Sequence, residues 1–238
     1  MPENIIVISI IFLAVFVQSV SGFGSALVAM SLLPLVVSIK VATPFVALLL
    51  TLVEIYLLLH YRHDFKWNSI WRVIVASVIG VPIGLFFLKQ VNEKTILTAL
   101  GVLVTGFALY ALLNIRLPKL SHPAWGYVFG LVAGIIGGAY NTSGPPIIIY
   151  GNCRGWKTEE FKSNLQGFFV VSSFAIVIGH IFSGNFTSEV WGYFWLSIPA
   201  AALGIALGTR MDKYISGEVF RKIVLVLLAI IGLRLIVL

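Results

Sequence analysis

Three small polar side chains, Asn141, Thr142 and Ser143, interrupt a strongly apolar stretch, GIIGGAYNTSGPPIIIYG, that runs from Gly134 to Gly151. In hydrocarbon every backbone N–H and C=O needs a partner, so a helix breaks at depth only where the freed groups are buried in protein or line a cavity. Glycines and a Pro-Pro pair permit such a break, and the helix that follows directs its positive dipole end at it. The pattern predicts an anion site at a broken transporter helix, with a loop at the membrane surface as the alternative.

A second break is predicted near the N-terminus. The apolar run from Ile5 to Ile39 is about 35 residues long, which would make roughly 50 Å of helix against a hydrocarbon core of about 30 Å. It must turn back, and the segment SVSGFGS from Ser19 to Ser25 predicts the turn, with a helix of about 16 residues on either side. The predicted substrate-binding residues at or near the two breaks are Gln18, Ser19, Ser21, Gly22, Gly24, Asn141, Thr142, Ser143, Gly144 and Gln166. Their alternative role is close helix packing by small residues.

The rest of the chain consists of apolar segments that position these breaks. With 238 residues, of which 59% are hydrophobic and 11% charged, the composition predicts an all-α polytopic membrane protein with no soluble domain. The predicted spans are Val41 to Tyr61, Ser69 to Leu88, Thr95 to Leu113, Phe161 to Phe182, Val190 to Thr209 and Val219 to Leu238. A single cysteine excludes an intramolecular disulfide and a cysteine-rich metal site, and we expect no cofactor.

The two halves of the chain, residues 1–120 and 121–238, follow the same pattern of one broken hairpin and three spans. A shift of 120 residues places Gly24 on Gly144, which supports a duplication. A shift of 124 residues aligns two small-xxx-small pairs, which we interpret as close-packing positions: Gly80 and Gly84 with Gly204 and Gly208.

Loop charge favours a topology in which each broken run folds back. The net charge of +7 comes from Lys and Arg in short loops, which argues for membrane orientation and against nucleic-acid binding. In the fold-back model twelve of the sixteen cations lie on one side: Arg62, Lys66, Arg72, Arg116, Lys119, Arg154, Lys157, Lys162, Arg210, Lys213, Arg221 and Lys222. The other four are Lys40, Lys89, Lys94 and Arg234. An eight-span model gives a weaker split of about 10 to 6, so we expect both termini outside the cytoplasm.

This topology makes the two repeats inverted, so that the breaks approach one another near the middle of the membrane. Each half then has either five crossings or three crossings and a re-entrant hairpin, and the sequence leaves both open. A substrate held there would meet neutral hydrogen-bond donors, because no Lys or Arg lies in the middle of an apolar segment. We expect alternating access by movement of one repeat against the other.

Glu54 is the only acid well inside an apolar run, and an ionisable group at that depth suggests a functional role such as proton coupling. A packing or snorkelling role is the alternative, because Glu54 is only about two turns from Arg62. Two other classes stay open. An intramembrane serine hydrolase would use Ser143 and His180, although His180 is expected near the surface, and an anion channel would need a filter that the sequence does not show.

The segments SVSGFGSALVAMSLLP and GIIGGAYNTSGPPIIIYG, together with the closing pattern from Gly204 to Arg210, resemble the TauE/SafE sulfite exporter family. This family is also called the 4-toluene sulfonate uptake permease (TSUP) family, and the resemblance covers essentially the whole chain. It implies a secondary transporter of the inner membrane, not an enzyme, that moves small sulfur-containing or organic anions such as sulfite, sulfoacetate or other organosulfonates, with coupling to protons. One departure is Phe23, which stands where consecutive glycines are common in the family.

Overall fold

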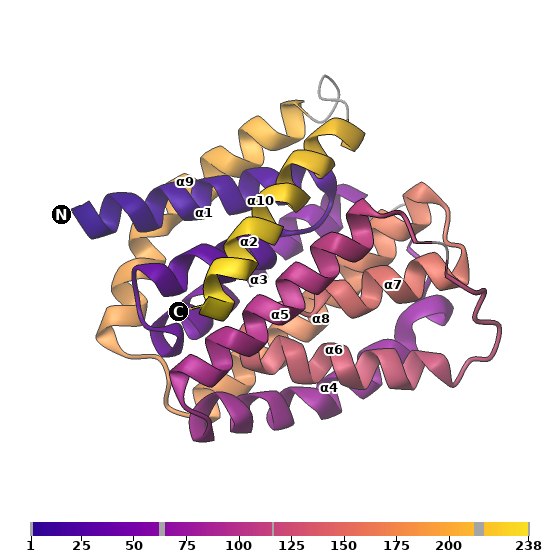
Figure 1. Cartoon of the computed structure of the whole chain (residues 1–238), viewed down its shortest axis with the longest axis horizontal. Helices are drawn as coiled ribbons and strands as arrows, with labels where there is room; N and C mark the ends of the chain where they lie inside the picture. The colour runs from indigo at the N-terminus through magenta and orange to yellow at the C-terminus, as the bar shows by residue number, and fades with distance from the viewer. Residues whose placement is uncertain (1, 62–64, 116, 212–216, 238) are drawn as a thin grey trace. The chain divides into compact units, whose positions relative to one another are not determined.

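The computed structural model describes residues 2–61, 65–115, 117–211 and 217–237, in which every regular element is a helix. The elements are α1 Pro2–Ser21, α2 Ser25–Leu32, the 3₁₀ helix η1 Leu33–Leu35, α3 Ile39–Tyr61, α4 Trp67–Gln90, α5 Glu93–Leu112, α6 Trp125–Tyr140, α7 Gly144–Arg154, α8 Thr158–Phe182, α9 Ser188–Met211 and α10 Gly217–Val237 (Figure 1). Among the described residues six helices, α1, α3, α4, α5, α8 and α9, are long and apolar enough to cross a membrane. The predicted all-α polytopic class is confirmed. Of the predicted loop cations, Arg62, Arg116 and Lys213 lie outside the described residues.

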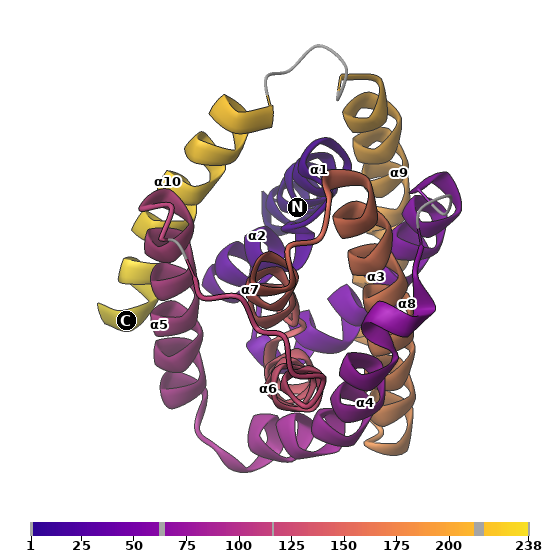
Figure 2. The same cartoon turned by 90° about the vertical axis from the view of Figure 1, so that its right-hand side faces the viewer.

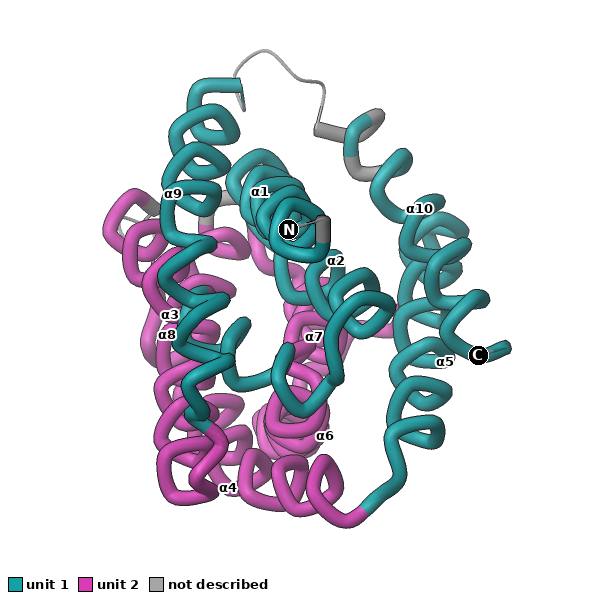
Figure 3. The backbone as a smooth tube through the Cα atoms, turned by 90° about the vertical axis from the view of Figure 1, so that its left-hand side faces the viewer, with its two compact units in different colours: residues 1–49, 91–115, 186–238 teal, residues 50–90, 116–185 magenta. Residues whose placement is uncertain are grey.

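The chain divides into two compact units, which Figure 3 distinguishes by colour. Unit 1 contains residues 1–49, 91–115 and 186–238, and unit 2 contains residues 50–90 and 116–185. Each unit takes helices from both halves of the sequence. The repeat boundary after residue 120 and the inversion of the repeats therefore stay predictions.

In unit 1, α1 packs against α9 and α5 packs against α10 (Figures 1 and 2). A Cβ atom added at Gly208 of α9 would lie 2.5 Å from the Cβ of Ser19, and one added at Gly204 would lie 3.0 Å from the Phe12 carbonyl oxygen. The predicted close-packing role of both glycines is confirmed, because a side chain at either position would push α1 and α9 apart.

In unit 2, α4 packs along α6, and glycines let the two backbones approach closely. A Cβ atom added at Gly84 of α4 would lie 2.0 Å from the carbonyl oxygen of Ile135, and one added at Gly134 of α6 would lie 2.1 Å from that of Ser77. The predicted role of Gly80 and Gly84 is thus confirmed. The structure adds a facing row of glycines on α6 at a spacing of four residues: Gly126, Gly130, Gly134 and Gly138.

Helices α4 and α8 of unit 2 run in the same direction. Polar contacts join their starts, middles and ends: Lys66 Nζ to Glu160 Oε2 at 3.0 Å, Ser77 Oγ to Ser172 Oγ at 3.4 Å, and Lys89 Nζ to the Ser183 carbonyl at 3.0 Å. Between α4 and α8 the chain contains one further span, α5, and then the broken run of α6 and α7. Helices α4 and α8 can therefore be parallel only if the broken run ends on the side of the membrane on which it begins. This geometry agrees with the fold-back topology, whereas the eight-span alternative requires α4 and α8 to be antiparallel.

The α6–α7 hairpin makes that return. Arg154, at the end of α7, donates through Nη1 to the carbonyls of Leu120 and Ser121, each at 2.7 Å, just before α6 begins. The rings of Phe129 and Tyr150 lie 5.6 Å apart between the two helices. Helix α7 has only 11 residues, about 17 Å of helix, so it cannot cross a core of about 30 Å. The short α7 agrees with a re-entrant hairpin for the second broken run, and full crossing or re-entry of this run stays a prediction.

The first broken run also breaks where the sequence predicts, but its two helices are unequal. Helix α1 has 20 residues and α2 only 8, so the expectation of two helices of similar length is wrong. Pro34 explains the short α2, because it has no N–H to continue the helical hydrogen-bond pattern, and the chain passes into the 3₁₀ turn Leu33–Leu35.

Candidate functional site

The break between α6 and α7 is a buried turn of three polar residues in unit 2. Helix α6 ends at Tyr140. The next residue, Asn141, adopts the left-handed conformation (φ 57°) and donates its backbone N–H to the Gly137 carbonyl at 2.7 Å. Among residues other than glycine, Asn is one of the few that tolerate this conformation, which explains its position. Asn141, Thr142 and Ser143 are at most 8% exposed. The predicted break thus holds its polar side chains inside the protein.

Backbone donors are scarcer at this break than the anion-site pattern suggests. The first N–H groups of a helix have no partner within it, and in α7 these positions are Ser143, Gly144, Pro145 and Pro146. The two prolines carry no N–H, so only Ser143 and Gly144 can offer one. Side chains must therefore supply part of the hydrogen bonding to any anion held here.

Thr142 provides such a group. Its side chain is fully buried, and its hydroxyl oxygen has no hydrogen-bond partner among the described residues. Buried polar groups are nearly always hydrogen-bonded, and leaving one unpaired costs about 1–3 kcal/mol. The unpaired hydroxyl marks Thr142 as a position where a ligand would gain an interaction that the protein itself does not satisfy.

Helix α8 forms the wall beside the break. A Cβ atom added at Gly144 would lie 3.6 Å from the Phe169 ring. Gln166 and Ser173, three residues before and four after Phe169, share its helical face, and both side chains are buried. The structure therefore places the predicted residue Gln166 on the face of α8 that contacts the break. Phe169 and Ser173 were not predicted, although their helical spacing from Gln166 could have indicated them.

Glu54 of α3 also belongs to unit 2. Its carboxyl group is 5% exposed, and its Oε2 accepts a hydrogen bond of 2.5 Å from the Ser173 hydroxyl. A snorkelling carboxyl would reach water, so the burial of Glu54 argues against the snorkelling role. It does not separate proton coupling from packing, and proton coupling stays a prediction. Ser173 thus connects the acid to the helical face that carries Gln166 and Phe169.

Asn164 is a further buried polar residue that the sequence analysis missed. Its Oδ1 accepts the backbone N–H of Lys66 at 2.9 Å, which ties the start of α4 to α8. Its Nδ2 is buried without a partner among the described residues. Only its position two residues before Gln166 could have drawn attention to it.

At the first break, in unit 1, the serine hydroxyls already donate hydrogen bonds within the protein. Gly22 and Gly24 both have positive φ angles, of 81° and 104°, which explains the glycines at these two positions. Ser19 donates its hydroxyl to the Val15 carbonyl at 2.8 Å, and Ser21 donates to the Val17 carbonyl at 2.7 Å or the Phe23 carbonyl at 2.6 Å. A hydroxyl has one hydrogen, so neither serine retains a donor for an anion.

Gln18 is the remaining side-chain donor at this break. It is buried, its Oε1 accepts a hydrogen bond from Ser25, and its Nε2 has no partner among the described residues. Ser19 packs against Gly208, as its alternative close-packing role requires. The two breaks lie in different units, and a joint site formed by both stays a prediction.

His180, the base of the hydrolase alternative, is fully buried in the last turn of α8, so the expectation of a surface histidine is wrong for it. Its Nδ1 lies 2.8 Å from the side-chain amide of Asn185, which follows the helix. This contact ties the ring to the segment after α8, a structural role that needs no serine partner.

Comparison with known proteins gives the family. The family model "Sulfite exporter TauE/SafE" matches residues 7–235. A curated relative from Cupriavidus necator, named "Probable sulfite/organosulfonate exporter TauE", is 25% identical over 226 residues, which cover 91% of this chain and 87% of the relative. "Probable inner membrane transporter protein TsaS" from Comamonas testosteroni is 25% identical over 176 residues, 71% of this chain and 72% of the relative. No solved structure matches. With helices that can cross a membrane and a family match over nearly its whole length, the chain is a multi-pass membrane protein that belongs to the TauE/SafE sulfite exporter family.

Proposed function

We propose that this protein is a secondary transporter that moves small sulfur-containing or organic anions, such as sulfite, sulfoacetate or other organosulfonates, across the inner membrane. Two curated relatives support this substrate class and location, because one is named a sulfite/organosulfonate exporter and the other an inner membrane transporter. Family membership alone does not identify the substrate-binding site, which has to be argued from the residues of this chain.

We assign the substrate-binding site to the α6–α7 break. Its one decisive feature is the buried Thr142 hydroxyl that has no partner among the described residues. A sulfite or sulfonate headgroup accepts several hydrogen bonds. In our proposal the Thr142 hydroxyl and the Ser143 and Gly144 N–H groups donate them, together with the side-chain amide of Asn141. The α7 dipole adds a partial positive charge at the same place.

Neutral donors suit transport because they hold an anion without trapping it. A bidentate bond to arginine would be stronger and harder to break, whereas donors of this kind permit release on the opposite side. In our proposal the release step follows from movement of one repeat relative to the other, which opens the site to each side in turn.

Proton coupling is assigned to Glu54. A carboxyl buried within a membrane span is costly to keep charged, so its ionisation is sensitive to an anion bound nearby. Ser173 donates to Glu54 from the helical face that carries Gln166. In this scheme Glu54 takes up a proton as the anion binds and releases it on the other side.

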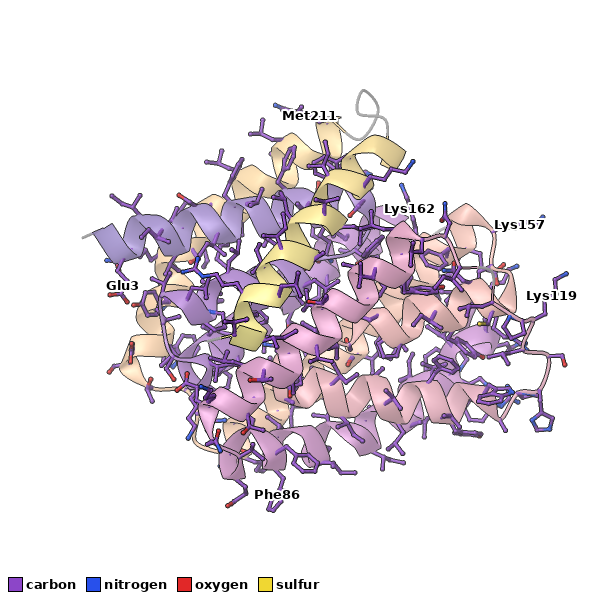
Figure 4. All side chains as sticks on the ribbon, viewed as in Figure 1. Glu3, Phe86, Lys119, Lys157, Lys162 and Met211 are labelled. Carbon is purple, nitrogen blue, oxygen red and sulfur yellow. The ribbon has the colours of Figure 1, made fainter. Side chains whose placement is uncertain are left out.

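Both termini are assigned to the outside of the cytoplasm. This orientation rests on the predicted excess of Lys and Arg on the cytoplasmic side, and the parallel course of α4 and α8 supports the underlying fold-back topology. Figure 4 places Lys119 and Lys157, two of the cations assigned to the cytoplasm, at the end of unit 2 opposite Phe86 near the end of α4.

The test is uptake of sulfur-labelled sulfite and of a small organosulfonate into proteoliposomes, with wild type and Asn141→Gly. Glycine is preferable to alanine because residue 141 has a positive φ angle, which alanine would adopt only with strain. We expect saturable flux in wild type and a clear loss of apparent affinity in the variant.

The matched control is Asn152→Ala, at an exposed position near the end of the same hairpin. Equal loss in the control and in Asn141→Gly, at equal folded yield, would remove the site assignment. Flux proportional to concentration without saturation would instead support the anion channel.

A further inference from the structure

A groove on the surface of unit 2 lies between the C-terminal parts of α4 and α8. It has a volume of about 550 Å³ and extends from Val78 on α4 and Ala175 on α8 to Lys89 and Ser183 at the helix ends. Apart from Lys89 and Ser183, every residue that lines it is apolar or a glycine. The groove is thus apolar along its length and polar at one end.

The groove walls face outward from two helices that can span a membrane. Phe86 of α4 and Ile178 and Phe182 of α8 are 60%, 50% and 89% exposed, and Figure 4 shows Phe86 projecting away from the ribbon. The floor forms at Gly179, where an added Cβ atom would lie 2.2 Å from Leu85 Cδ1. Within a bilayer this surface is in contact with acyl chains, because membrane spans bury such faces in hydrocarbon.

The polar end carries a positive charge. Lys89 is exposed, and its Nζ donates one hydrogen bond, to the Ser183 carbonyl at 3.0 Å. An ammonium group has three N–H donors, and no carboxylate of the described part of the chain forms an ion pair with Lys89. Because α4 and α8 both end here, the charge lies at the level where a span leaves the hydrocarbon and meets lipid headgroups.

We propose that this groove binds a phospholipid with a net negative headgroup, whose acyl chain lies along the apolar walls and whose phosphate contacts Lys89. The apolar walls alone give no preference among lipids, since acyl chains interact with other acyl chains as well as with apolar side chains. Discrimination therefore comes from the headgroup. One basic residue near a charged membrane surface corresponds to about a fivefold preference for the anionic lipid.

The experiment measures lipids that remain bound to the detergent-purified full-length protein by native mass spectrometry, after incubation with equal amounts of phosphatidylglycerol and phosphatidylcholine of identical chains. We expect wild type to retain phosphatidylglycerol about fivefold in excess and Lys89→Gln to retain both lipids equally. Lys94→Gln, at an exposed lysine of α5 that does not line the groove, keeps the preference. Ala175→Leu narrows the groove and lowers retention of both lipids.

Two results would overturn the proposal. One is a phosphatidylglycerol preference that survives in Lys89→Gln. The other is full displacement of the lipid by water-soluble glycerol phosphate, which would reduce the site to an anion contact without an acyl chain.

Discussion

Replacing Thr142 by valine should have opposite effects on stability and on substrate binding. The substitution exchanges a hydroxyl for a methyl group of similar size. In the protein without substrate the Thr142 hydroxyl is buried and has no partner among the described residues, so its removal should raise the free energy of unfolding by about 1 kcal/mol or more. A hydrogen bond to a charged ligand contributes about 1.5–3 kcal/mol, so the same change should weaken anion binding roughly tenfold to a hundredfold.

Two assays on the same preparation measure these effects. One is the free energy of unfolding in detergent without substrate, and the other is the concentration dependence of labelled sulfite uptake into proteoliposomes. Thr43→Val is the matched control, because Thr43 is equally buried but donates its hydroxyl to the Ile39 carbonyl at 2.6 Å within its own helix. Thr43→Val should leave the apparent affinity unchanged.

A Thr142→Val protein with lower stability and unchanged uptake would contradict both expectations. That result would mean that the hydroxyl bonds to the protein itself and that the anion binds elsewhere.

The proposed proton coupling, the helix packing and the orientation of α4 can each be tested by substitution. Glu54→Gln keeps the shape of the side chain and the Ser173 hydrogen bond but cannot carry a proton. Substrate exchange should therefore continue, whereas accumulation driven by a proton gradient should be lost. Labelled uptake with and without the gradient measures both effects. Gly84→Ala forces a Cβ atom to within 2.0 Å of the Ile135 carbonyl oxygen, and should lower the free energy of unfolding in detergent by about 1–3 kcal/mol. Single cysteines at Lys66 and Lys89, in a Cys153→Ser background, should react with an impermeant thiol reagent from opposite sides of the membrane, position 66 from the cytoplasm.

Each of these predictions has a control or a contradicting result. Glu189→Gln, at an exposed acid at the start of α9, should keep the gradient dependence, and a Glu54→Gln protein that still responds to the gradient would exclude Glu54 as the coupling group. Gly106→Ala adds a Cβ atom with nothing within 4 Å, so it should be neutral or stabilise by up to about 1 kcal/mol. Labelling of positions 66 and 89 from the same side would contradict a membrane-spanning α4.

The helices and the positions of both breaks could be predicted from the sequence alone. Apolar length predicted the ends of the spans to within three residues, because a helix must carry enough apolar residues to cross the hydrocarbon. The breaks were evident from glycine, proline and small polar residues in segments that otherwise have no reason to contain them. Helix lengths within the broken runs were less predictable, because a single residue, Pro34, ends the run after the first break early.

The partners of each polar side chain could not be predicted. Ser19, Ser21 and Thr142 are all small hydroxyl residues near a break, yet the two serines donate to carbonyls within their own helix and the threonine does not. The difference depends on local backbone geometry, which composition and spacing do not specify. Likewise, nothing in the sequence indicated that Ser173 reaches Glu54, 119 positions away along the chain.

The position of the bound anion would show whether the α6–α7 break is the substrate site. A crystal of the protein soaked with selenite, the selenium analogue of sulfite, would locate the ligand by its anomalous scattering. If the α6–α7 break binds the anion, we expect a selenium peak within hydrogen-bonding reach of the Thr142 hydroxyl and the Ser143 and Gly144 N–H groups. The peak should be absent from crystals of Thr142→Val under the same conditions. A peak elsewhere in the protein, unchanged by the substitution, would contradict the claim that the α6–α7 break binds the transported anion.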